Sequence, residues 1–267
     1  MGDETVPIDD RGFAYGDGLF ETVLIRDGEP LLWPEHLERL ARGCERLGIP
    51  MPTRETLDAL PARAEPGLWL LKIILTRGSG GRGYCPPASP EPRLYWQLSS
   101  FAPQGERWQE GVRVRLCELR LGLQPHLAGL KHLNRLENVL ARQEWCDEGI
   151  VEGLLCDSDG ALVEGTCMNL FWLRDGRLET PCLDRCGVAG TLRAALLASQ
   201  SIEEVSSPVE TLYAVDALWL GNSVQGLWPV TQLEDSTGTI IMQWTLSDAH
   251  RTLQSAAHGL LGYPRTA

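Results

Sequence analysis

The strongest constraint on the fold is a change of hydrophobic period near the start of the chain. Residues 20–32, FETVLIRDGEPLL, read as two short strands around Asp27-Gly28, a dipeptide typical of tight hairpins. In residues 34–49 the apolar side chains instead recur every three to four positions. This spacing predicts an amphipathic helix, with a proline in its first turn and a glycine at its end.

Strands and helices are expected in both halves of the chain. Further strands are predicted at 68–78, 92–102, 112–121, 151–173 (two strands around an acidic turn) and 215–222. Further helices are predicted at 53–64, after Lys131, within 186–199 after a glycine turn, and at 247–261. The two kinds of element do not alternate strictly, so the expected class is α+β.

A domain boundary is predicted where the composition changes. Between Phe101 and Gly111 the chain becomes polar and contains a proline and glycines, and a fresh strand follows. We therefore expect a smaller N-terminal domain, residues 1–106, and a larger C-terminal domain, residues 107–267, which carries Lys131.

The charge and composition exclude several classes of partner. The chain has 36 acidic and 24 basic residues, a net charge of −12, which argues against nucleic-acid and anionic-membrane partners. No apolar run approaches the ~18–20 residues of a membrane span, and the acidic start MGDETVPIDD does not resemble a signal peptide. A cytoplasmic location is expected, and the eight cysteines are then read as reduced thiols. Cys182 and Cys186 lack the usual zinc spacing, so no metal is expected.

Glu164 is a carboxylate within an apolar strand, LVEGTCMNLFWL. One interpretation is a solvated strand end, with Gly165 marking a bulge. The other is a buried acid that meets the positive charge of a ligand, because an unpaired buried carboxylate costs several kcal/mol.

The run CGVAGTLRAAL places two glycines before a predicted helix start. Such a turn exposes backbone N–H groups at the positive end of the helix dipole and can bind phosphate. An ordinary glycine turn into a helix is the commoner explanation of this pattern.

Lys131 lies in LKHLNRLEN, residues 130–138. Leu130, Leu133, Leu136 and Val139 have helical spacing, which predicts a helix that begins near the lysine. Most lysines are solvated surface charges, whereas a nucleophilic lysine must be partly desolvated.

Two further segments have open interpretations. Arg39 lies opposite the apolar Leu37–Leu40–Cys44 face, so the pattern alone predicts a solvated side chain. The loop GGRGY, residues 80–84, is either a surface connection or a mobile segment that covers a substrate. A serine hydrolase has little support, because no G-x-S-x-G elbow occurs.

A lysine nucleophile, a buried glutamate and a phosphate-type turn together suit pyridoxal 5′-phosphate. This cofactor needs an amine for its Schiff base, an acidic partner for its pyridine nitrogen, and an anion cradle for its phosphate.

Four runs carry a resemblance to a known family: 11–22 (RGFAYGDGLFET), 76–84 (TRGSGGRGY), 121–142 (LGLQPHLAGLKHLNRLENVLAR) and 164–172 (EGTCMNLFW). The chain resembles the fold-type IV pyridoxal-phosphate enzymes over almost its whole length. It is most similar to the lyases of that family that act on 4-amino-4-deoxychorismate, and the third run separates these from the transaminases. The resemblance implies an α+β fold with the cofactor in the cleft between two domains, and a homodimer.

The resemblance also implies roles for particular residues. It places the Schiff-base lysine at Lys131 and the pyridine-nitrogen carboxylate at Glu164. The implied phosphate contacts are Arg39, the backbone N–H groups of Gly190, Thr191 and Leu192, and Asn222.

The implied reaction converts 4-amino-4-deoxychorismate to 4-aminobenzoate and pyruvate, a step of folate biosynthesis. Lys131 acts as the base at the carbon that bears the nitrogen. By position, Thr22 and Tyr15 are candidates to protonate the leaving group, and Arg82 with Tyr84 to bind substrate carboxylates. Functional coupling to aminodeoxychorismate synthase, which supplies the substrate, is a further expectation.

Two alternatives remain open. The first is a fold-type IV aminotransferase of branched-chain or D-amino acids, with the same lysine and glutamate. The second is a non-catalytic protein that binds the cofactor or has lost it. The LKHLNRLEN and GGRGY runs favour the lyase over the first, and the intact lysine, glutamate and arginine argue against the second.

Overall fold

The computed structural model describes residues 5–264, and the chain divides into two compact units. The first unit is the chain up to Ala102 together with Leu130–Arg135, and the second is Pro103–Gly129 together with the chain from Leu136 onward. The predicted boundary between residues 106 and 107 stays a prediction, but contacts group the segment around Lys131 with the first unit. Residues 1–4 and 265–267, the outer ends of the two predicted domains and the start of the acidic N-terminus, lie outside the described residues.

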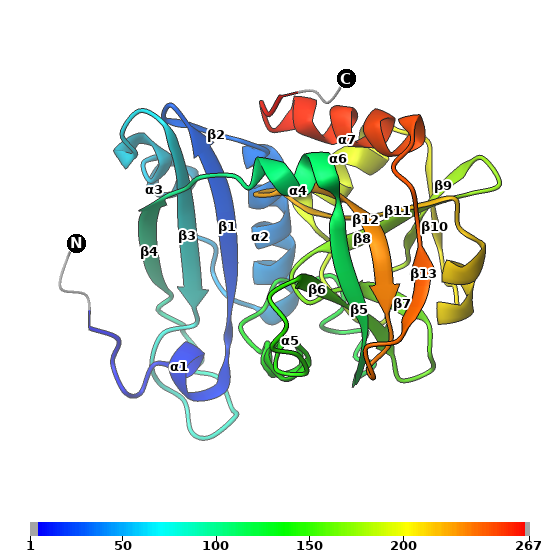
Figure 1. Ribbon diagram of the computed structural model, residues 1–267. Coiled ribbons are helices and arrows are strands. Elements are labelled where there is room, and N and C mark those ends of the chain that lie inside the picture. Colours follow the sequence, from blue (N-terminus) through cyan, green and yellow to red (C-terminus); the bar gives the residue numbers. More distant parts are fainter. Residues whose placement is uncertain (1–4, 265–267) are drawn as a thin grey trace. The chain divides into compact units, whose positions relative to one another are not determined.

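The first unit contains one antiparallel four-stranded sheet in the order β2-β1-β3-β4 (Figure 1). Its elements are α1 (Arg11–Tyr15), β1 (Gly18–Arg26), β2 (Glu29–Pro30), α2 (Trp33–Leu47), α3 (Arg54–Asp58), the short 3-10 helix η1 (Pro61–Arg63), β3 (Leu68–Thr76) and β4 (Arg93–Ser100). The helix expected over residues 53–64 is therefore split into α3 and η1, because proline at position 61 removes a helical N–H donor.

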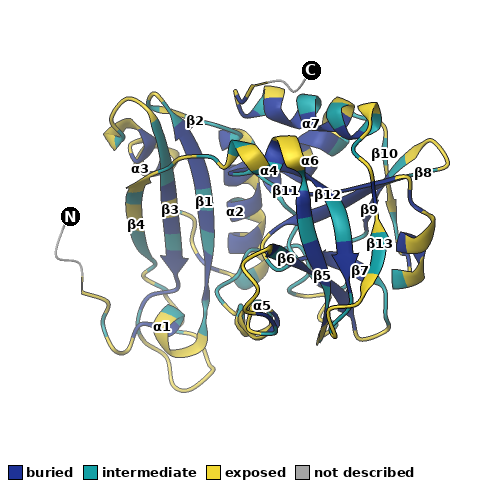
Figure 2. Cartoon of the chain, viewed as in Figure 1, coloured by how far each residue is buried: buried dark blue, intermediate teal, exposed yellow. Residues whose placement is uncertain are grey.

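The predicted hairpin and helix form the core of this unit. Asp27 and Gly28 both have positive φ, 50° and 84°, as a tight hairpin turn requires. Alternate side chains of β1 then face α2, whose apolar stripe packs against them to form one buried cluster. The cluster includes Leu19, Val23, Ile25, Leu37, Leu40 and Cys44. Figure 2 shows this side of α2 in the colour of buried residues.

The helix predicted to begin near Lys131 is wrong for residues 130–135. This segment is extended and joins β1: the Phe20 N–H donates to the Lys131 carbonyl at 2.9 Å, and the Leu133 N–H donates to the Gly18 carbonyl at 3.0 Å. The helix α5 begins only at Leu136 and ends at Arg142. Pairing with a strand edge satisfies the backbone groups that a helix would otherwise satisfy, so the leucine spacing was misleading here.

The second unit contains a mixed sheet in the order β10-β9-β8-β11-β12-β5-β6-β7, with β13 paired to β12 (Figure 1). Its strands are β5 (Val112–Leu121), β6 (Ile150–Asp157), β7 (Leu162–Gly165), β8 (Asn169–Arg174), β9 (Arg177–Pro181), β10 (Ile202–Val205), β11 (Ala217–Asn222), β12 (Gly226–Glu234) and β13 (Ile240–Gln243). Its helices are α4 (Gly105–Glu110), α5 (Leu136–Arg142), α6 (Thr191–Ser199), the 3-10 helix η2 (Val209–Ala214) and α7 (Asp248–Leu260).

The strands β5, β6, β7, β8 and β11 lie in segments where the sequence predicted strands, whereas β9, β10, β12 and β13 were not predicted. The run 151–173, expected as two strands, forms three, because a turn at residues 166–168 separates β7 from β8. Only Gly165 separates that turn from Glu164. The strands β7, β8 and β11 are buried almost throughout, as Figure 2 shows by their dark colour. Such continuous burial explains their mainly apolar sequences, in which Glu164 of β7 is the exception that carries a charge inside the strand.

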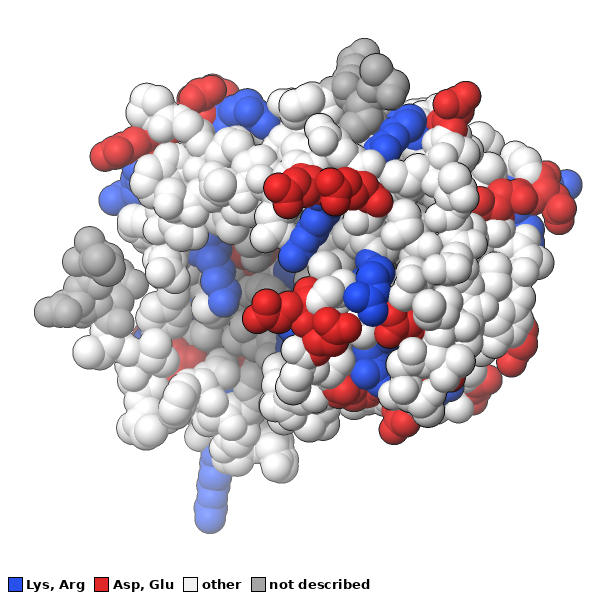
Figure 3. Space-filling model, in the orientation of Figure 1, with Lys and Arg blue, Asp and Glu red and all other residues white. Residues whose placement is uncertain are grey.

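The mixture of an antiparallel sheet, a mixed sheet and packed helices confirms the predicted α+β class. All eight cysteines carry free thiols. Among residues 5–264, no helix is long and apolar enough to cross a bilayer. On the face in Figure 3, acidic and basic side chains of the described residues are interspersed, and no broad basic field of the kind that attracts nucleic acid is visible there.

Candidate active site

Lys131 is held against the edge of β1. Its carbonyl accepts the Phe20 N–H, and its ammonium lies 4.3 Å from the centre of the Phe20 ring. The neighbouring Asn134 side chain donates to the Gly16 carbonyl at 3.0 Å and fixes the segment at its other end. The lysine is half-buried, so its charge is partly desolvated and faces an aromatic ring. A lysine in this environment is suited to nucleophilic chemistry.

Arg39 lies in a buried cluster with Glu21 and His36, which we call the Glu21 cluster. The Arg39 Nε donates to Glu21 Oε1 at 2.8 Å, and its Nη2 donates to Oε2 at 2.5 Å. His36 Nδ1 lies 2.6 Å from Glu21 Oε2. The pattern-based prediction of a solvated Arg39 is wrong, since the residue is only 5 % exposed. The polar stripe of α2 is buried here because β1 presents a carboxylate to it.

Burial and charge act in opposite directions on the Glu21 cluster. Burial raises the pKa of the Glu21 carboxyl, but the charges of Arg39 and His36 outweigh this effect and lower the pKa to about 2. Burial lowers the pKa of His36, and the Lys131 charge acts in the same direction. Glu21 is therefore an anion at neutral pH, and the cluster lies within electrostatic reach of Lys131.

The loop of residues 78–92 is anchored by an arginine that sequence reasoning missed. The buried Arg11 donates to the carbonyl oxygens of Gly83 at 3.0 Å and Tyr84 at 3.1 Å, and pairs with Asp17 at 2.9 Å. The Tyr84 side chain is 87 % exposed, and its ring lies 5.4 Å from that of Tyr15. Arg11 therefore holds the loop by its backbone and leaves its side chains outside the core.

The substrate-side candidates of the first unit fall into two groups. Thr22 lies on β1, two positions from Phe20, so both side chains point to the same face of the sheet. Tyr15, Arg82 and Tyr84 lie around the loop and are exposed. Thr22 thus shares a face with the ring that the Lys131 ammonium contacts.

Glu164 is the penultimate residue of β7 and is 4 % exposed. Its Oε2 accepts the Val188 N–H at 2.9 Å. The turn that brings Val188 close contains Gly187, with φ of 81°, where an added Cβ would lie 2.7 Å from Val163 Cγ1. The alternative of a solvated strand end is therefore wrong, and the sheet holds a buried carboxylate at this position.

The turn before α6 has the geometry of an anion cradle. Gly190 is the N-cap of α6, and within the described chain no side chain caps this helix end. A Cβ on Gly190 would lie 1.9 Å from Asn169 Oδ1, so any larger residue would displace the Asn169 side chain. Asn169 in turn donates to the Val188 carbonyl at 2.9 Å. Val188 thereby connects Glu164 to the start of α6, where Thr191 and Leu192 are buried.

Asn222 joins two turns through its side-chain amide. Its Nδ2 donates to the Cys167 carbonyl at 3.2 Å, and its Oδ1 accepts the N–H groups of Val224 and Gln225 at 3.0 and 2.8 Å. The turn that contains Cys167 is also held by a residue of β6. The buried Glu152 accepts the Thr166 N–H at 2.8 Å and the Cys167 thiol at 3.0 Å.

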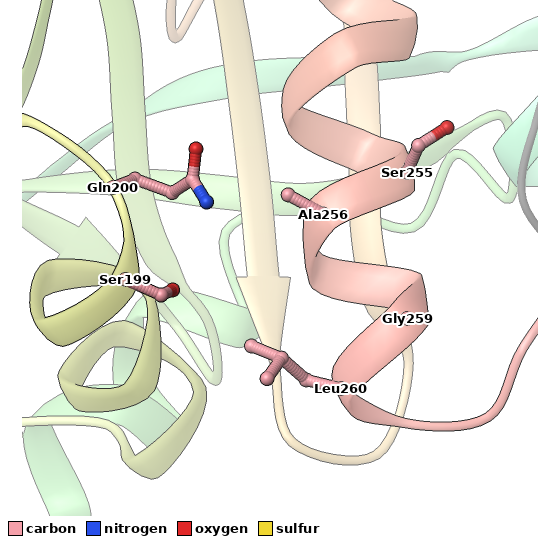
Figure 4. A pocket seen from close by; sticks show the side chains of 6 residues that line it. All are labelled: Ser199, Gln200, Ser255, Ala256, Gly259 and Leu260. Carbon is pink, nitrogen blue, oxygen red and sulfur yellow. The ribbon is translucent and has the colours of Figure 1, made fainter.

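A surface hollow elsewhere in the second unit carries none of this chemistry. It has a volume of about 440 Å³ and lies between the end of α6 and α7 (Figure 4). Its lining residues are Ser199, Gln200, Ser255, Ala256, Gly259 and Leu260. None of them is ionisable, and none is a predicted site residue.

The structure brings the predicted residues together in two groups, one in each unit. The first unit places Lys131 near the Glu21 cluster, and the second places Glu164 near the start of α6. Sequence reasoning missed Glu21, His36, Arg11 and Glu152. A signal was present for Glu21, because a carboxylate interrupts an otherwise apolar strand, as Glu164 does. Nothing local marks the partners of Arg11.

The chain belongs to the class IV aminotransferase family, whose model matches residues 18–233. It is 37 % identical to aminodeoxychorismate lyase of Vibrio harveyi over 85 % of this chain and 86 % of that one. The crystal structure of 4-amino-4-deoxychorismate lyase from Pseudomonas aeruginosa is similar with a TM-score of 0.87 and 44 % identity, over 96 % of this chain and 95 % of that one. A fold-type IV transaminase from Curtobacterium pusillum has a TM-score of 0.79 and 28 % identity, over 99 % and 92 %. The resemblance and the fold predicted from the sequence are thereby confirmed.

Proposed function

We propose that this protein is a pyridoxal-phosphate-dependent lyase that converts 4-amino-4-deoxychorismate to 4-aminobenzoate and pyruvate. The observation that carries the proposal is the 44 % identity, over nearly the whole chain, to a structure described as that lyase. The 37 % identity to a second enzyme of the same name supports it. We place the reaction in the cytoplasm, as the step of folate biosynthesis that follows the synthase, and we propose that the two enzymes are functionally coupled.

The residues of both units fit pyridoxal 5′-phosphate, and we propose that both contribute to its binding. The half-buried Lys131 is suited to the Schiff base, and the buried Glu164 to the pyridine nitrogen. The turn at Gly190, into which no Cβ fits without displacing a side chain, is suited to the phosphate through the backbone N–H groups of Gly190, Thr191 and Leu192. Arg39 adds a cation, and Asn222 shapes the neighbouring turns. When bound, the cofactor supplies an electron sink for the carbon next to the substrate nitrogen.

The protein's own groups would then hold one proton and move another. The carboxylate of Glu164 holds a proton at the pyridine nitrogen, because a buried anion stabilises a cation beside it. The amine of Lys131, once released by the substrate, takes the proton from the carbon that bears the nitrogen. Loss of the enolpyruvyl group makes the substrate ring aromatic, which drives the reaction forward.

The substrate-side assignments are part of this proposal. The hydroxyl of Thr22 shares the β1 face of the Phe20 ring and is our first choice to protonate the leaving oxygen, with Tyr15 as the other candidate. Arg82 and Tyr84 lie on the anchored loop, where an exposed guanidinium is available for a carboxylate.

We also propose that the chain consists of the two domains 1–106 and 107–267 and forms a homodimer. The exposed apolar side chains of the helix α5 support the dimer. On α5, Leu136 is 76 % exposed, Val139 48 % and Leu140 55 %. Three large apolar side chains on one short helix form a surface typical of subunit contacts.

A transaminase is the second candidate function. The likeness to a fold-type IV transaminase and a 28 % identity to a putative branched-chain-amino-acid aminotransferase of Methanocaldococcus jannaschii favour it. Both kinds of enzyme belong to the same family, but the sequence identity of this chain to the two lyases named above is higher than to these transaminases.

The test is to supply purified protein with 4-amino-4-deoxychorismate, formed in place by its synthase, and to measure 4-aminobenzoate and pyruvate together. Equal amounts of both products, lost in Lys131→Ala, are expected. Lys72→Ala, a change of an exposed lysine on β3, is the control. A coloured protein that forms neither product but transfers an amino group from D-alanine or leucine to a 2-oxo acid would be a transaminase.

A further inference from the structure

Arg107 is a partly buried arginine without an anionic partner. It lies on α4, and in residues 5–264 its guanidinium makes no hydrogen bond or ion pair. Its contact is with an aromatic ring: the guanidinium carbon lies 4.7 Å from the ring centre of Trp228. Partial burial lowers the pKa of the guanidinium.

The fully buried arginines differ from the partly buried Arg107 in having carboxylate partners. This holds for Arg11, Arg39, Arg77, Arg115 and Arg193, whose nitrogens lie within 3.5 Å of an aspartate or glutamate oxygen. A guanidinium carries five N–H donors, and one that has no carboxylate beside it is available to an anionic ligand. The indole N–H of Trp228 is also buried and has no partner among the described residues.

The position of Arg107 connects it to the proposed site. Arg107 lies near the side chain of Cys167, in the turn that begins two residues after Glu164. The carbonyl of Cys167 accepts from Asn222, which is proposed to lie near the cofactor phosphate. The next residue, Trp108, donates from its indole to the Gln225 carbonyl at 2.7 Å and so fixes α4 to the turn after Asn222.

We propose that Arg107 binds a carboxylate of the small-molecule substrate, with the Trp228 ring holding the guanidinium in place. The assignment rests on the proposed lyase function, whose substrate carries two carboxylates. A planar guanidinium pairs with a carboxylate through two parallel hydrogen bonds, and the stacked ring limits its freedom before binding. Arg107 then determines substrate affinity and not cofactor affinity.

The test uses Arg107→Gln and Arg107→Lys in the full-length protein with bound cofactor. The matched control is Arg142→Gln, because Arg142 also stacks on a tryptophan, 4.5 Å from the ring centre of Trp145, but donates to a carbonyl. Three quantities are measured: KM and kcat for 4-amino-4-deoxychorismate, the affinity for pyridoxal 5′-phosphate by visible absorbance, and the relative affinities for 4-aminobenzoate and its neutral analogue 4-aminobenzamide.

We expect KM to rise about 10- to 100-fold in Arg107→Gln and less in Arg107→Lys, with the cofactor affinity unchanged, as for a lost charge-assisted pair. Loss of the preference for 4-aminobenzoate over the amide would assign the ring carboxylate. A raised KM with that preference intact would assign the enolpyruvyl carboxylate.

A KM within twofold of the Arg142→Gln value would overturn the proposal, as would a fall in cofactor affinity that matches the rise in KM. The comparison of acid with amide needs no turnover, so it separates this inference from the lyase function. A wild-type protein that forms no 4-aminobenzoate but prefers the acid through Arg107 would contradict only the function. Neither turnover nor a preference for the acid would contradict both.

Discussion

The carboxylate of Glu21 binds the guanidinium of Arg39 through two hydrogen bonds, of 2.8 and 2.5 Å, inside the first unit. Both side chains are almost fully buried, at 2 % and 5 % exposure. Breaking such a pair leaves an unpaired charge in the core, which costs about 3–5 kcal/mol.

We therefore expect Glu21→Gln to lower the free energy of unfolding by about 3–5 kcal/mol, measured by urea denaturation. Glu38→Gln is the control, because Glu38 lies on the outside of α2, 3.9 Å from Arg42, in an exposed pair worth less than about 1 kcal/mol. Equal losses in the two variants would show that the buried pair contributes no more than a surface pair.

Glu164→Gln separates charge from shape at the buried acid of β7. The amide oxygen can still accept the Val188 N–H, so the fold should be kept. The amide cannot hold a proton at a pyridine nitrogen as a carboxylate does, and we expect kcat to fall at least about 100-fold. Circular dichroism and steady-state kinetics on one preparation check both points. Undiminished turnover would exclude the proposed role of Glu164.

Arg11→Lys should release the loop that contains Tyr84. A lysine has no planar fork and cannot replace the several hydrogen bonds that Arg11 donates to loop carbonyls. We expect chymotryptic cleavage after Tyr84 to become about tenfold faster, as for the loss of one to two hydrogen bonds in a local opening. Arg82→Lys, in the same loop but exposed, should leave the cleavage rate unchanged. Equal rates in both variants would mean that Arg11 does not anchor the loop.

His250 should make the second unit less stable in mild acid. Burial, with a smaller contribution from Arg251, lowers the pKa of this histidine from 6.5 to about 4. Between these two values the unfolded chain binds a proton at His250 that the folded chain does not. The stability that the neutral, buried His250 contributes is therefore intact above pH 6.5 and is lost as the pH falls towards 4. One such group changes the free energy of unfolding by at most about 1.4 kcal/mol per pH unit.

Urea unfolding between pH 7 and 5 tests this prediction. In His250→Gln the stability should depend less on pH, since glutamine does not titrate but can still bond back to Ser247, as His250 does at the start of α7. A slope unchanged by the substitution would assign the acid sensitivity to other groups.

The exposed apolar side chains of α5 should hold two copies together. Leu136→Glu combined with Leu140→Glu places charges on this surface, and we expect sedimentation velocity to show a shift from dimer to monomer. Ile240→Glu, a change of a 50 % exposed apolar residue on β13, is the matched control and should remain dimeric. A wild-type protein that is monomeric would contradict the proposed homodimer.

The sequence by itself determined the local elements with strong periodic signals. The Asp27-Gly28 hairpin needs positive φ at both residues, and α2 has a full apolar stripe, so both could be predicted from nearby residues alone. The two unusual residues Lys131 and Glu164 were also visible in the sequence, because a resemblance to a known family marks them.

Only the tertiary structure decided which of these signals would be overridden. The leucines around Lys131 have helical spacing, yet the segment pairs with β1, because backbone bonds to Phe20 and Gly18 come from more than a hundred residues away. Arg39 has the pattern of a solvated residue, yet it is buried because Glu21 lies opposite it on another element. The spacing of apolar residues shows only which side of a segment is apolar. Whether a charged residue is buried depends on the partner that the fold brings to it.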